Sequence, residues 1–144
     1  MSSRMNERDA VVGAINPGTQ SVGSVNTNSI DLKNYRRVMF VVMTGSLAGG
    51  GLVDFKVQSS DASAGTFTDV AGLAITQMNN SNGTNSQAIV EVTADQLADG
   101  QQFVRGRLTV STANAPAAVL ALAGDARYEP VASFDATTVT QIVD

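Results

Sequence analysis

The stretch 36–60 constrains the fold of this chain more than any other part of the sequence. Its segment 38–43 contains no polar residue, is rich in valine and is too short to span a membrane, which predicts a strand covered on both faces. After a glycine-rich break, residues 53–58 alternate strictly between apolar and polar types, as expected for a strand with one buried face. We expect these two strands to pair as a hairpin, because the glycines allow the chain to reverse.

Similar short strands recur along the rest of the chain. The sequence predicts them at residues 11–15, 21–25, 67–70, 74–77, 88–93, 103–111 and 117–123. The last two would form a second hairpin, a turn is expected at 16–18, and single helical turns are expected within 28–35 and 94–100. About eight short strands joined by turn-rich loops are typical of an antiparallel β-sandwich, with a jelly roll as the leading topology and an immunoglobulin-like sandwich as the second.

The size and composition fit a single domain. The chain has 144 residues, of which 43% are hydrophobic, which is enough apolar material for one core. Residues 1–12 are mostly polar and predict an N-terminal arm, and residues 13–130 are expected to form the β-sandwich domain. Residues 131–144 carry scattered apolar side chains and predict either a strand that closes the sheet or an arm for a neighbouring subunit. The expected fold is therefore all-β, with flexible terminal arms.

Several classes of function are disfavoured by composition. The chain has neither histidine nor cysteine, so the commonest general base and the commonest metal ligands are missing, and we expect no catalytic site, no metal site and no cofactor. The formal net charge is −4, and Arg36-Arg37 is the only adjacent basic pair, which disfavours nucleic acid as a partner. The charged N-terminus lacks the apolar core of a secretion signal, so synthesis in the cytoplasm and no membrane association are expected.

Two groups of charged side chains deserve separate interpretation. The loop acids Asp61, Asp69, Asp95 and Asp99 do not follow the spacing of a calcium-binding loop. Arg105 and Arg107 lie on one side of the predicted strand 103–111, where they would either grip a carboxylate-bearing partner or form a solvated face opposite an acid such as Glu91.

A fixed order of structural motifs covers residues 30–80. It consists of Ile30-Asp31-Leu32 and Tyr35, the apolar strand, the alternating strand, Phe67-Thr68-Asp69-Val70 and Ala74-Ile75-Thr76-Gln77. This order resembles small head proteins of tailed bacteriophages, specifically the jelly-roll decoration or cement proteins. The motifs are structural, and they carry no catalytic positions.

The resemblance implies a function and a partner. It implies a structural virion protein that sits on the outer surface of the assembled capsid, clamps neighbouring major capsid subunits and forms a homo-oligomer, with a trimer favoured. The terminal arms are the expected contact regions. The contact residues predicted for the major capsid protein are Arg4, Met5, Arg8, Arg105, Arg107 and Phe134. The alternatives are a phage tail or head-fibre component and a carbohydrate-binding β-sandwich module, although a chain without tryptophan offers little for stacking on sugar rings. An enzyme is the third possibility.

Overall fold

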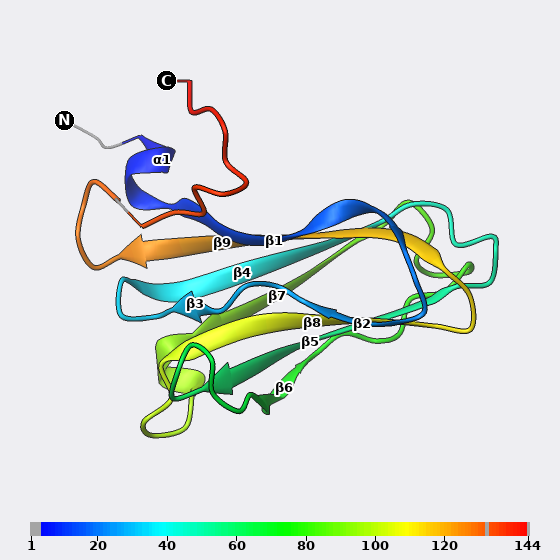
Figure 1. Cartoon of the computed structure of the whole chain (residues 1–144), viewed down its shortest axis with the longest axis horizontal. Helices are drawn as coiled ribbons and strands as arrows, with labels where there is room; N and C mark the ends of the chain where they lie inside the picture. Colours follow the sequence, from blue (N-terminus) through cyan, green and yellow to red (C-terminus); the bar gives the residue numbers. More distant parts are fainter. Residues whose placement is uncertain (1–3, 132, 144) are drawn as a thin grey trace.

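The computed structural model describes residues 4–131 and 133–143, and across them the chain is an all-β sandwich of two antiparallel sheets (Figure 1). The strands are β1 (Ala10–Gln20), β2 (Gly23–Asn26), β3 (Ile30–Asp31), β4 (Tyr35–Thr44), β5 (Leu52–Ser60), β6 (Thr68–Ala74), β7 (Gln87–Thr93), β8 (Phe103–Ser111) and β9 (Ala115–Ala126). One helical turn, α1 (Met5–Arg8), precedes β1, and one 3₁₀ turn, η1 (Ala94–Gln96), follows β7. The 3₁₀ turn confirms the helical turn expected within 94–100.

The order of strands in the two sheets is that of a jelly roll. One sheet has the order β1-β9-β4-β7 and is called the β4 sheet below. The other has the order β2-β8-β5-β6, with β3 also paired to β8, and is called the β5 sheet. Strands of the first half pair with strands of the second half in reverse order, so the chain resembles one long hairpin, with its tip between β5 and β6, rolled into two layers. The predicted fold class is confirmed.

Both predicted hairpins are wrong. The strands β4 and β5 lie in different sheets, and so do β8 and β9. Instead, β4 pairs with β9 and β7, while β5 pairs with β8 and β6. The physical reason is that each sheet has one apolar face to bury, and connections that cross between the layers place these two faces against each other. The glycine-rich segment 45–51 therefore bridges the layers rather than closing a hairpin.

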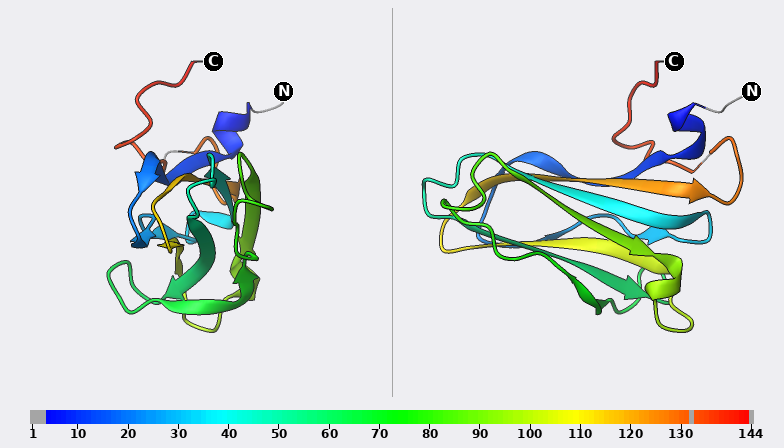
Figure 2. Two further views of the ribbon diagram at one scale, coloured as in Figure 1. Left: turned by 90° about the vertical axis from the view of Figure 1, so that its right-hand side faces the viewer. Right: turned by 180° about the vertical axis from the view of Figure 1, so that it is seen from behind.

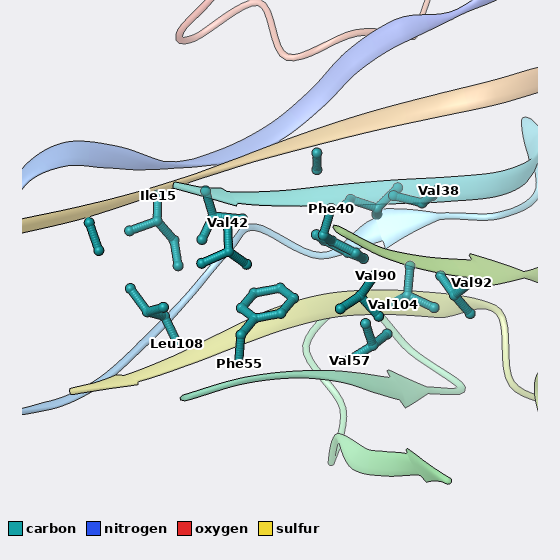
Figure 3. Close-up of a cluster of buried hydrophobic side chains, with 14 of the residues drawn as sticks. Ile15, Val38, Phe40, Val42, Phe55, Val57, Val90, Val92, Val104 and Leu108 are labelled. Atoms are coloured by element: carbon teal, nitrogen blue, oxygen red, sulfur yellow. The ribbon is translucent and has the colours of Figure 1, made fainter. Parts of the chain in front are cut away.

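The core lies between the layers and is built from alternating side chains. Val38, Phe40 and Val42 of β4 are fully buried, and the inward side chains of β5 meet them from the other sheet (Figure 3). The rings of Phe40 and Phe55 lie in contact, with 5.6 Å between their centroids. The one-faced burial expected for residues 53–58 is confirmed up to Val57, since Val53, Phe55 and Val57 are each at most 2% exposed. Gln58, expected on the other face, is also buried, at 7% exposed.

The prediction that the apolar strand 38–43 is covered on both faces is wrong. The burial of β4 alternates, so that Met39, Val41 and Met43 point away from the core. The side chain of Met43 is 45% exposed, and those of Met39 and Val41 are partly exposed. An unbroken apolar sequence therefore forms a strand with one face in the core and one apolar face outside it.

Three local predictions differ from the structure. Residues 16–18 lie inside β1, where the register with β9 shifts, rather than in a turn between strands. Because β1 is an edge strand, its proline removes no hydrogen bond that an interior strand would need. The segment 28–35 contains β3 and a turn in place of a helical turn. A single strand, β6, runs from the segment expected at 67–70 to Ala74, and residues 75–77 of the second expected strand lie outside it.

The two terminal segments lie together at one end of the sandwich (Figures 1 and 2). The strand β1 begins at Ala10, within the range assigned to the N-terminal arm. The backbone amide of Val131 donates to the carbonyl of Glu7 at 3.0 Å, and that of Asp135 donates to the carbonyl of Val11 at 2.8 Å. The described residues after β9 contain no strand, so the closing-strand alternative is not seen there. These segments bind each other and β1 rather than extending separately from the domain.

Candidate functional site: the terminal groove

An apolar groove lies where the two terminal segments meet β1 and β9. We call it the terminal groove, and it encloses a cavity of about 260 Å³. It is lined by Met5, Asn6, Asp9, Ala10, Val11, Leu122, Val131, Phe134, Val139 and Ile142. The groove therefore combines α1, the first residues of β1, one outward side chain of β9 and the C-terminal segment.

Hydrogen bonds hold both walls of the groove in place. In the N-terminal wall, the backbone amide of Arg4 donates to the Glu7 carboxylate at 2.7 Å and closes the turn of α1. In the C-terminal wall, the Asp135 carboxylate accepts from the hydroxyl of Thr138 at 2.7 Å and from the backbone amide of Thr137 at 3.2 Å. Hydrogen bonds from these two threonines hold the pKa of Asp135 below its usual value, because they stabilise the ionised form.

The C-terminal wall is also anchored from the core side. The hydroxyl of Tyr35 donates to the backbone carbonyl of Ser133. Tyr35 is only 2% exposed, and burial raises the pKa of its hydroxyl above the usual value, so it remains a donor at neutral pH. The position of the tail is thus set by a residue at the start of β4, a central strand of the sandwich.

The two terminal segments concentrate exposed apolar side chains, and three of these, Met5, Phe134 and Ile142, line the groove. Among the described residues, nine large hydrophobic side chains are exposed, and five of them belong to α1 or to the segment after β9. The five are Met5 (72% exposed), Tyr128 (79%), Phe134 (38%), Ile142 (53%) and Val143 (91%). Clusters of this kind on a folded protein mark surfaces that contact another molecule.

Four of the six predicted contact residues lie at this end of the molecule. Met5 and Phe134 line the groove together, although 129 positions separate them in the sequence (134 − 5). Arg4 caps α1, and Arg8 is exposed in its last turn. Sequence reasoning missed Leu122 as a lining residue, because it lies in β9 and only the fold places it beside the termini.

Arg105 and Arg107 lie on the other layer, on the outer face of the β5 sheet. The Arg105 Nε donates to Gln58 Oε1 at 3.0 Å, and its guanidinium lies 4.2 Å from the centre of the Phe67 ring. Arg107 is directly opposite Lys56 in the sheet. The structure therefore separates these two arginines from the terminal groove.

The acid expected opposite these arginines is a different residue from the one predicted. Glu91 lies in the β4 sheet and pairs with Arg37 at 3.5 Å, so the assignment of Glu91 is wrong. The acid that joins the polar network beside these arginines is Asp69, which accepts from Gln58 at 2.9 Å and from Lys56 at 2.9 Å. These bonds, with the charge of Arg107, hold the pKa of Asp69 below its usual value. The face is a solvated network of paired polar groups.

Two further kinds of site, a metal-binding cluster and a membrane-spanning helix, are not found among the described residues. No group of three or more His, Cys, Asp or Glu side chains among them is arranged to hold a metal ion, and this includes the loop acids considered above. Within the same part of the chain, no helix has the length and apolar character needed to cross a bilayer.

Comparisons with known proteins relate the chain to others through its fold. No protein-family model matches the sequence, and no curated protein matches it. A solved structure described as the PBSX exported protein XepA is similar over the whole of this chain, with a TM-score of 0.59 and 11% identity. A structure of infectious bursal disease virus, Gx strain, aligns with 87% of the chain at a TM-score of 0.39 and 10% identity. The chain covers 45% of the first protein and 32% of the second, and the first likeness shows a shared β-sandwich fold.

Proposed function

We propose that this chain is a structural protein of a phage particle that binds the outer surface of the assembled capsid and stabilises it. The observation that carries the proposal is that three exposed apolar side chains, those of Met5, Phe134 and Ile142, meet at the terminal groove, on a sandwich without histidine or cysteine. Such a surface suits adhesion, because burying apolar area drives association without requiring a reactive group. The jelly-roll topology and the likeness to a PBSX protein support the same setting.

In this proposal, the terminal groove contacts the major capsid protein. Phe134 and Met5 supply the apolar centre of the contact, and the exposed arginines of the N-terminal turn, Arg4 and Arg8, supply its polar rim. Because the two walls of the groove are already ordered, binding costs less conformational entropy than the folding of an extended arm would cost. The chain has no catalytic role in this account.

Stabilisation then follows from mass action. A protein that binds the assembled shell but not separate capsid subunits lowers the free energy of the shell by an amount that grows with its concentration. The shell consequently withstands a higher temperature or internal pressure. Placement on the capsid surface, assembly as a trimer and clamping of adjacent subunits are parts of the proposal that rest on the resemblance to decoration proteins.

The test is binding of purified protein to capsids that lack it. We expect the double variant Met5→Asp/Phe134→Asp to lose at least about tenfold in capsid affinity, because two charges must be desolvated at the contact. The matched control is Val22→Asp, since Val22 is 56% exposed but lies in the turn between β1 and β2, at the opposite end of the sandwich (Figure 1). Co-sedimentation with intact shells and with separate subunits measures both affinities.

Three outcomes would contradict the proposal: equal binding of the double variant and the wild type, equal binding to shells and to separate subunits, or no sedimentation with shells at all. Specific retention on a glycan array would instead favour a carbohydrate-binding module.

A further inference from the structure

The strand β7 forms one margin of the β4 sheet, and its open side differs from the other margins of this sandwich. Each sheet ends in two edge strands, which are β1 and β7 in the β4 sheet and β2 and β6 in the β5 sheet. An edge strand exposes backbone N–H and C=O groups that can pair with a strand of another chain. Folded proteins usually prevent such pairing with a proline, a bulge or a very short edge strand.

Three of the four edges carry a feature of this kind. The strand β1 contains Pro17 and two shifts of register against β9. The strand β2 has only four residues, and β6 has a register shift against β5 and carries Gly72 at a φ of +79°. The strand β7 has seven residues without proline, glycine or lysine, and its register with β4 is unbroken. It is therefore the edge best suited to receive another strand.

The backbone groups on the open side of β7 belong to alternate residues. The amide of Thr44 donates to the carbonyl of Ser86 at 3.0 Å, so these two residues form a hydrogen-bonded pair at the end of the ladder between β4 and β7. Hydrogen-bonded and non-hydrogen-bonded pairs alternate along antiparallel strands, so the even-numbered residues of β7 direct their backbone groups to β4. The odd-numbered residues Gln87, Ile89 and Glu91 direct theirs to the open edge.

No described segment pairs with this open side. Within the described sheets, β7 is bonded to β4 alone. At the end of the strand, the amide of Thr93 donates to Oε1 of Gln96 at 2.8 Å, so the 3₁₀ turn satisfies that group. Among the described residues, no hydrogen bond from another segment reaches the edge-facing backbone groups of Gln87, Ile89 and Glu91.

The side chains along this edge are complementary to a second copy of themselves. Gln87, Ile89 and Glu91 are all exposed, and Ile89 is 62% exposed. When two copies of β7 meet antiparallel about a twofold axis at Ile89, each Ile89 lies opposite the other, and each Gln87 lies opposite a Glu91. The glutamine amide then donates to the carboxylate, and the two isoleucines cover each other. On the inner side, the same register places Ala88 opposite Val90.

The neighbouring registers are less favourable. An axis at Glu91 would place two carboxylates directly opposite each other, which is destabilising. An axis at Val90 would place Glu91 opposite Ile89 and would use the amide of Thr93, which already donates to the 3₁₀ turn. The charge of Glu91 is also countered within its own chain, because Arg37 lies 3.5 Å from its carboxylate.

We infer that two copies of this chain associate edge to edge through β7, which joins their β4 sheets into one continuous sheet. In strand addition, main-chain hydrogen bonds supply the affinity, so the association does not depend on a large apolar area. A contact of this limited size is expected to be weak, with a dissociation constant in the micromolar range. The terminal groove stays open in such a pair, because it lies at β1 and β9, on the other side of β4.

The test is analytical ultracentrifugation of the purified full chain, from micromolar to several hundred micromolar concentration. We expect a monomer–dimer equilibrium for the wild type. Ile89→Lys places two like charges opposite each other at the axis and should raise the dissociation constant at least about tenfold. Ile89→Pro removes an amide that faces the open edge rather than β4, so it should abolish the dimer and leave the fold intact. The matched control is Val25→Lys, which adds the same charge at an apolar position (40% exposed) of the edge strand β2 and should leave the equilibrium unchanged.

A second pair of variants tests the register. Gln87→Lys places an ammonium group opposite Glu91 and should lower the dissociation constant by about two- to tenfold, whereas Gln87→Glu places two carboxylates opposite each other and should raise it by a similar factor. Circular dichroism checks the folding of every variant.

Four results would overturn the inference: a monomeric wild type at several hundred micromolar, a trimer in place of the dimer, an association unchanged in both Ile89 variants, or equal weakening by Val25→Lys. A trimer would instead support the assembly implied by the resemblance to decoration proteins. The measurement uses protein alone, and the variants lie outside the terminal groove. Its failure is therefore distinguishable from a failure of capsid binding.

Discussion

Gly106 in the middle of β8 provides the sharpest test of how the core is packed. A Cβ atom at this position would lie 2.6 Å from Cε2 of Phe55, closer still to its Cζ, and 3.2 Å from Cδ1 of Phe40. Both rings are at most 2% exposed and contact each other, so the Phe55 ring has no open space to move into. The missing side chain of Gly106 is therefore what makes room for the aromatic pair.

The expected cost of Gly106→Ala follows from this geometry. Overpacking a tight core typically costs about 1–3 kcal/mol, and we expect the upper part of that range here because two rings must shift together. For a domain of this size, the melting temperature falls by about 2–4 °C for each kcal/mol, so a decrease of about 5–10 °C is expected. The assay is urea unfolding followed by circular dichroism at one protein concentration, since self-association would otherwise add to the apparent stability.

A double-mutant cycle separates the proposed clash from a general effect of alanine. In a Phe55→Leu background, the added methyl group enters space that the ring has left, so Gly106→Ala should cost at least about 1 kcal/mol less than in the wild type. The control is Gly49→Ala, because Gly49 has nothing within 4 Å of its Cβ position and its substitution should change stability by less than about 0.5 kcal/mol. The reasoning is refuted if Gly106→Ala costs no more than Gly49→Ala, or if its cost is the same in both backgrounds.

Two further predictions concern polar groups. The buried backbone amide of Gly106 donates to the Thr27 hydroxyl at 2.9 Å. Thr27→Val removes this acceptor, so it should lower the free energy of unfolding by about 1–3 kcal/mol in the same urea assay. Thr27→Ser keeps the hydroxyl and should retain most of the stability. Hydrogen bonds from Gln58 and Lys56 of β5 lower the pKa of Asp69 in the folded state. The ionised carboxylate therefore stabilises the fold at pH values above its unfolded-state pKa, and this stabilisation is lost as the pH falls through the lowered, folded-state pKa. The melting temperatures of wild type and Asp69→Asn should therefore converge as the pH falls below the unfolded-state pKa of about 3.9, and a difference that stays constant from neutral to acid pH would contradict this.

The character of the individual strands could be predicted from the sequence. In β8, apolar or small residues alternate with Arg105, Arg107 and Thr109, and the structure buries the first set and exposes the second at least in part. The same holds for β5 up to Val57. Successive side chains of a strand point to opposite faces because of the local geometry of the chain. The face that each residue occupies can therefore be predicted from the sequence without knowledge of the partner strand.

The partners of the strands could not be predicted in this way. Sequence reasoning paired neighbouring strands along the chain, whereas β4 pairs with β9 and β7 from the second half. A hairpin and a crossing connection both need a flexible loop, so the glycines at 45–51 fit either one. The choice depends on which arrangement buries both apolar sheet faces, and that is a property of the whole chain.

The sequence by itself determined that the chain is all-β and that residues 53–58 and 103–111 alternate between an apolar and a polar face. Only the tertiary structure decided that Met5 and Phe134 share a groove and that the apolar strand has one side facing outward. The reason is physical. The burial of a residue within a strand depends on its immediate neighbours, whereas a surface is assembled from segments distant in sequence, and their meeting is set by the packing of the two layers.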